Sequence, residues 1–124
     1  MNVVSTTEQW AGAAIAGPKS RDLLQNLFPN SDVSNEGLPF MGYTEGDMFG
    51  VKARIFRISF SGELAYEVNV ESDYGNFMWE KIMEIGEEFN IQPYGTEAYL
   101  LLELKWDMLL DQNLMAEQFL MILL

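Results

Sequence analysis

The side chains that could carry out chemistry in this chain of 124 residues are limited in kind, because the sequence contains no histidine and no cysteine. Their absence excludes Ser-His and Cys-His nucleophilic systems, disulfides and cysteine-based metal sites. The commonest zinc ligand is missing as well, so we expect no metal site. Acid–base chemistry would have to come from carboxylates, lysines, tyrosines, a substrate or another polypeptide.

Three charged residues stand close together in the most regular part of the sequence: Arg57, Glu63 and Glu67. Taken alone, Glu67 is most simply a solvated strand residue, and Glu63 serves the geometry of a turn. Arg57 is unusual on an apolar strand. It could pair with Glu67 or Asn69 or reach a ligand, and we expect the pairing.

A hairpin is predicted to position these residues. Residues 51–60 and 64–70 have the composition of strands, and residues 61–63 contain the glycine of a short connecting loop. The second strand alternates with a period of two. Its apolar face consists of Leu64, Tyr66, Val68 and Val70, and we expect Glu67 to point the other way.

The flanking segments predict two helices. Gly17-Pro18 suits the opening of the first, whose buried stripe is Leu23, Leu24, Leu27 and Phe28. The second, with an apolar stripe between Tyr74 and Phe89, could be capped by Ser72 or Asp73.

The remaining segments complete the expected fold. Residues 3–15 are predicted to form one strand or two short ones, and Thr96 could cap a final helix. Residues 32–50 look like an apolar loop that packs either on its own domain or on a partner. This order predicts an α+β fold, in which an antiparallel sheet has two helices on one face, as in a split β-α-β, ferredoxin-like lobe.

The net charge of the chain makes some classes of binding partner unfavourable. Seven Lys and Arg against 19 Asp and Glu give a net charge of −12, which repels nucleic acids and anionic membrane surfaces. We find no signal peptide pattern and no apolar stretch of about 18 residues. A cytoplasmic location is therefore expected.

Three segments carry a resemblance to a known superfamily: residues 16–24 (AGPKSRDLL), 57–67 (RISFSGELAYE) and 90–98 (NIQPYGTEA). Together they resemble the glycine-cleavage aminomethyltransferases (T-proteins), the dimethylglycine dehydrogenases and the carboxyl-terminal region of the sarcosine oxidase alpha subunit. Residues 32–36 and 73–75 look most like the sarcosine oxidase branch. We assign residues 1–104 to a partial folate-binding lobe of this kind.

The resemblance implies folate chemistry. Members hold tetrahydrofolate within a cloverleaf of three domains and transfer a one-carbon unit to it; in sarcosine oxidase the donor is oxidised sarcosine. Of the matched hairpin, Phe60 corresponds to a residue that lines the folate site, although alone it is more simply core. Glu67 corresponds to the carboxylate that hydrogen-bonds the pterin ring.

The chain departs from the superfamily in ways that put activity in doubt. The lobe that supplies the catalytic aspartate has no counterpart here, and Tyr99 stands where T-proteins have a folate-binding arginine. We therefore expect a fragment that is catalytically silent by itself and holds no cofactor tightly. It would work with the rest of the alpha subunit or with other oxidase subunits. A non-catalytic assembly subunit and a freestanding folate-binding module remain alternatives.

Residues 105–124 form an atypical apolar tail. Read in another frame, a back-translation of this segment yields glycines at the family's spacing, which suggests a single-base deletion near Leu104. The alternative is an amphipathic helix from Trp106 to Leu124. The uncharged run 119–124 must lie on the body, pair with another chain as a homodimer, or promote aggregation.

Overall fold

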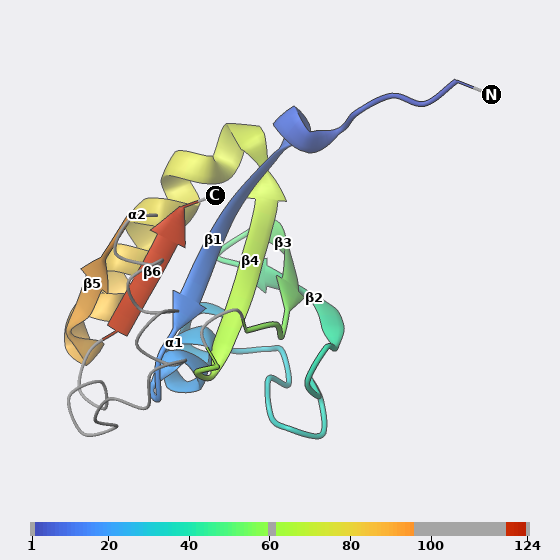
Figure 1. Ribbon diagram of the computed structural model, residues 1–124. Helices are drawn as coiled ribbons and strands as arrows, with labels where there is room; N and C mark the ends of the chain where they lie inside the picture. The colour runs from blue at the N-terminus through green and yellow to red at the C-terminus, as the bar shows by residue number, and fades with distance from the viewer. Residues whose placement is uncertain (1, 60–61, 96–118, 124) are drawn as a thin grey trace.

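One six-stranded sheet forms the centre of the protein in the computed structural model, which describes residues 2–59, 62–95 and 119–123 (Figure 1). The strands lie in the order β2-β3-β4-β1-β6-β5. The elements are β1 (Trp10–Ala16), α1 (Ser20–Leu27), β2 (Tyr43–Met48), β3 (Val51–Phe56), β4 (Ala65–Glu71), α2 (Gly75–Gly86), β5 (Ile91–Pro93) and β6 (Phe119–Leu123). Short 3₁₀ turns precede β1 and flank α2.

The topology confirms the predicted α+β fold. Strand β4 pairs antiparallel with both β1 and β3, so these two are parallel to each other with β4 between them. That arrangement, with α1 in the connection, is a split β-α-β unit. Strand β6 adds an antiparallel neighbour on the other side of β1, and β5 pairs parallel with β6.

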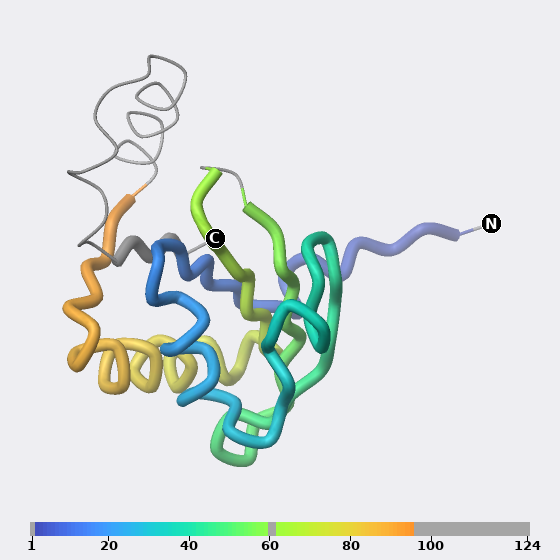
Figure 2. The backbone as a smooth tube through the Cα atoms, turned by 90° about the horizontal axis from the view of Figure 1, so that it is seen from below, coloured from blue at the N-terminus to red at the C-terminus, as the bar shows by residue number. Residues whose placement is uncertain are grey.

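Both helices cover the same face of the sheet, as Figure 2 shows for α1 and α2 against β1 and β4. The predicted stripe of α1 (Leu23, Leu24, Leu27, Phe28) is fully buried against β4 and α2. Tyr66, Val68 and Val70 of β4 supply part of the sheet side of this core. Burial of each such side chain contributes roughly 1.5–3 kcal/mol, so the helix-covered face holds the domain together.

Strand β2 corrects the prediction of a loop at residues 32–50. It pairs with β3 over its whole length, from Tyr43 opposite Phe56 to Met48 opposite Val51. The segment also contains Gly46, a residue typical of turns. Here glycine is needed for packing, because a Cβ would lie 2.8 Å from Cδ1 of Phe28.

Other predicted boundaries also differ. Strand β3 ends at Phe56 rather than at residue 60, and β1 begins only at Trp10. No side-chain cap hydrogen bond is made at the start of α2, so the expected capping by Ser72 or Asp73 was wrong. The helix after Thr96 and the positions of Phe60 and Tyr99 lie outside the described residues.

The apolar run near the end of the sequence lies on the body of the protein. Phe119–Leu123 forms β6, whose Met121 pairs with Ile15 of β1 and with Pro93 of β5. A helix through these residues is therefore excluded. The reading-frame hypothesis concerns the DNA and stays a prediction. Within the part of the chain that is described, no helix is long and apolar enough to cross a membrane.

Candidate functional site

Glu67 lies in the middle of the sheet on the face opposite the helices. Its neighbours on β4, Tyr66 and Val68, point into the core, and successive side chains of a strand point to opposite faces. Across the strands it stands opposite Ala14 of β1 and Phe56 of β3. The predicted orientation of Glu67 is confirmed.

The Glu67 carboxylate is half-buried and unpaired. Among the described residues it makes no hydrogen bond or ion pair, and its cross-strand neighbours offer only hydrocarbon. Burial raises the pKa of Glu67 above its ordinary value, because removal of water disfavours the charged form. A carboxylate in such a place is unsatisfied by the protein itself and is suited to accept hydrogen bonds from a ligand.

Glu67 has small residues beside it on β1 and an aromatic residue beside it on β3. On β1, Gly12 and Ala14 carry little or no side chain, and the Asn69 amide lies so close to Gly12 that a Cβ there would be 2.7 Å from its Oδ1. On β3, Phe56 forms a tilted ring pair with Tyr43 at a centroid distance of 5.0 Å.

Arg57 does not join this site. The expected pairing with Glu67 or Asn69 was wrong, because its Nη1 donates to Oδ1 of Asn35 at 2.8 Å and to the carbonyl oxygen of Leu38 at 3.1 Å. Sequence alone could not reveal this, since the partners come from the segment between α1 and β2. Glu63 lies half-buried before β4.

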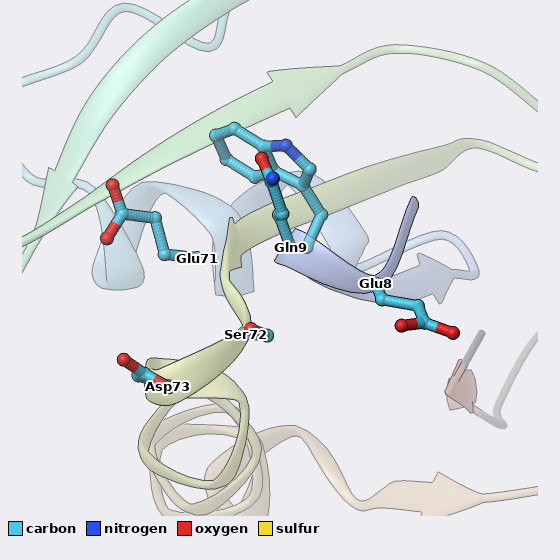
Figure 3. A pocket seen from close by; sticks show the side chains of 6 residues that line it. Glu8, Gln9, Glu71, Ser72 and Asp73 are labelled. Atoms are coloured by element: carbon cyan, nitrogen blue, oxygen red, sulfur yellow. The ribbon is translucent and has the colours of Figure 1, made fainter. Parts of the chain in front are cut away.

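A separate hollow lies where the chain enters β1 and leaves β4 (Figure 3). It is lined by Glu8, Gln9, Trp10, Glu71, Ser72 and Asp73. The Glu8 and Glu71 carboxylates point away from one another. No cluster of acidic residues that could hold a metal ion occurs in the described ranges. The guanidinium of Arg54 covers the Trp10 ring at 3.8 Å from its centroid. Glu67 does not line this hollow.

Comparison with known proteins confirms the family resemblance. The profile of the family described as "GCVT N-terminal domain" matches residues 1–118. The sarcosine oxidase subunit alpha of Corynebacterium sp. (strain P-1) is 50% identical over 95 residues, which are 76% of this chain. That of Rhizobium meliloti is 41% identical over 107 residues, 85% of this chain. The aminomethyltransferase of Bacillus subtilis is 35% identical over 98 residues, 79% of this chain.

These relatives are much longer than the chain. The matched segment spans 10% and 11% of the two sarcosine oxidase subunits and 26% of the aminomethyltransferase. The similarity therefore concerns one part of each relative.

Proposed function

Because the chain belongs to the GCVT N-terminal domain family, we propose that it forms part of the folate-binding surface of an aminomethyltransferase-like protein of the sarcosine oxidase branch. The observation that carries the proposal is the Glu67 carboxylate, half-buried and without a partner among the described residues. The family resemblance assigns the pterin ring to this position.

The chemistry of the site suits a pterin. The ring presents adjacent N–H donors, and one carboxylate accepts two of them through charge-assisted hydrogen bonds. Ala14 places only a methyl group beside the carboxylate, and Phe56 offers an aromatic neighbour. When bound, tetrahydrofolate supplies the nitrogens that accept the one-carbon unit. The chain's own part is to bind and orient it through Glu67. Phe60, the second folate-lining residue by resemblance, belongs to the same proposal.

The chain is proposed to act within a larger assembly. In the parent family, as the resemblance implies, a one-carbon unit passes from oxidised sarcosine to tetrahydrofolate, and the aspartate beside the folate comes from another lobe. We therefore propose that this chain binds folate but catalyses no transfer alone. The rest of an alpha subunit, or other oxidase subunits, would supply the remaining groups.

Calorimetric titration of the chain with tetrahydrofolate tests this function. We expect saturable binding that weakens about tenfold to a hundredfold in Glu67→Gln, because the amide replaces one charged acceptor with a donor. Glu71→Gln, on the same strand and the same face, is the matched control and should bind as the wild type does. If the wild-type chain gives no heat of binding, the proposal that it binds folate is wrong. If Glu67→Gln binds as tightly as the wild type, only the assignment of the site to Glu67 is wrong.

A role in subunit assembly is favoured by a second observation. Phe40 and Met41 are 65% and 70% exposed before β2, and Phe49 is 54% exposed after it. Met41 and Phe49 also adopt left-handed φ values of 63° and 52°, which are uncommon for large side chains. Replacement of Phe40 and Met41 by serine should abolish co-purification with other oxidase subunits while folate binding persists. Unchanged co-purification would contradict this role.

A further inference from the structure

Two arginines from distant parts of the sequence converge on one oxygen atom. Nη2 of Arg21, in the first turn of α1, donates to Oδ1 of Asn35 at 2.6 Å, and Nη1 of Arg57, just after β3, donates to the same oxygen at 2.8 Å. Nε of Arg21 also donates to the hydroxyl oxygen of the buried Tyr66 at 2.9 Å. Two positive charges are thus held side by side on a neutral acceptor.

The charge of the protein makes this pairing unusual. The sequence contains seven basic and 19 acidic residues, so carboxylates that could pair with each arginine are plentiful. Yet the ion pair found among the described residues is Lys81 with Glu84, on the surface of α2. Arg21 and Arg57 are half-buried and have no carboxylate partner in the described part of the chain. Two like charges at such close range repel each other unless an anion lies between them.

Two further buried polar atoms are unsatisfied, one of them on Arg57 itself. Nε of Arg57 and Oγ of Ser59, two residues along the chain, are buried and have no hydrogen-bond partner among the described residues. Each unsatisfied buried group costs roughly 1–3 kcal/mol. Nε–H of arginine is part of the planar fork with which guanidinium groups bind carboxylates and phosphates through two bonds. The atoms left over are therefore those that an oxyanion would use.

From this convergence we infer an oxyanion site between Arg21 and Arg57, which takes a carboxylate or a phosphate group. Asn35 is exposed, so its side chain can leave and an anionic oxygen can take the place of its Oδ1. The exchange replaces a neutral acceptor with a charged one, which forms stronger bonds with both guanidinium groups. The site is separate from Glu67, because Arg21 binds Tyr66, whose side chain leaves β4 on the opposite face.

The test follows the arginine Nε–H signals of the full chain by NMR while sodium phosphate or sodium acetate is added at constant ionic strength, with chloride as the balancing ion. Arg21 and Arg57 should shift along a saturable curve with a dissociation constant on the order of 1 mM. Arg54, which stacks on Trp10, is the internal control and should not follow it. A response to phosphate alone, to acetate alone or to both assigns the source of the oxyanion. No saturable shift, or an equal shift of Arg54, overturns the proposal.

Asn35→Asp provides a matched variant of nearly identical shape. Its carboxylate would occupy the site from within the chain, so anion binding should weaken about tenfold or more. The Arg21 and Arg57 signals should already be displaced before any anion is added. Binding as tight as that of the wild type would show that the anion does not occupy the position between the two arginines, and would overturn the site.

Discussion

Glu67 of β4 and Phe56 of β3 stand directly opposite each other, which places a carboxylate beside an aromatic ring on the sheet face away from the helices. Charged and aromatic side chains in this relation gain little from each other, and no described residue neutralises the charge. The ionised Glu67 carboxylate therefore lowers the stability of the folded protein, and protonation of Glu67 removes this effect.

We predict that Glu67→Gln makes the protein more stable at neutral pH. Burial raises the pKa of Glu67 in the folded state above its ordinary value of 4.5. Between these two values the folded state binds more protons than the unfolded state, so stability falls as pH rises through that window. Urea unfolding between pH 4 and 7 should show this fall in the wild type and a smaller one in Glu67→Gln. Parallel curves for the two proteins would contradict a raised pKa.

Gln25 is predicted to stabilise the end of α1. Its amide donates to the carbonyl oxygens of Phe28 at 3.1 Å and Ser31 at 3.0 Å, which ties the helix to the turn that follows it. Gln25→Ala should lower the free energy of unfolding by about 1–2 kcal/mol. Asn26→Ala, at the next exposed position of the helix, should change it by less than about 0.5 kcal/mol. Equal effects in chemical denaturation would show that the two bonds contribute nothing.

Gly46 is predicted to tolerate no side chain. A methyl group there would lie 2.8 Å from both Cδ1 of Phe28 and Oγ of Ser31, and 3.2 Å from Cδ1 of Ile55. Gly46→Ala should therefore cost about 1–3 kcal/mol through overpacking. Gly95→Ala, where an added Cβ would meet no atom of the described residues within 4 Å, is the control and should be close to neutral in thermal unfolding. A stable Gly46→Ala variant would mean that β2 does not pack on α1 as described.

Met121 is predicted to need its backbone N–H. The residue lies in β6 between Ile15 of β1 and Pro93 of β5, and proline removes a donor from the interior of a sheet. Met121→Pro should destabilise the protein by about 1–3 kcal/mol, whereas Met121→Leu keeps the donor and should cost less. Hydrogen exchange at Ala14 and Ile15 would report the loss locally. Identical unfolding curves for the two variants would contradict the pairing of β6 with β1 and β5.

The parts of the fold that sequence predicted are those in which a short segment determines its own burial. The stripe of α1 and the alternation around Tyr66 and Val68 are of this kind, since spacing alone separates buried from exposed positions. The orientation of Glu67 followed from the same period. Its unpaired state did not, because that depends on Ala14, which a different strand brings alongside.

The errors have the opposite cause. Strand β2 contains Gly46 and acidic residues, and it is a strand because β3 pairs with it and Phe28 fills the space above the glycine. The partner of Arg57 was missed because Asn35 belongs to a segment whose position no local pattern predicts. In both cases tertiary contacts overrode local preference. The family resemblance, by contrast, rested on motifs that can be read within single segments, and the family profile confirmed it.

The place of β6 between β1 and β5 has a consequence for synthesis of the protein on the ribosome. Strand β1 receives its second neighbour only after about 100 further residues have been added. At roughly 5–20 residues per second, the edge of Ala13–Ala16 that later pairs with β6 stays open for about 5–20 seconds. During that interval it is a target for chaperones, and for strands of other nascent chains on the same messenger RNA.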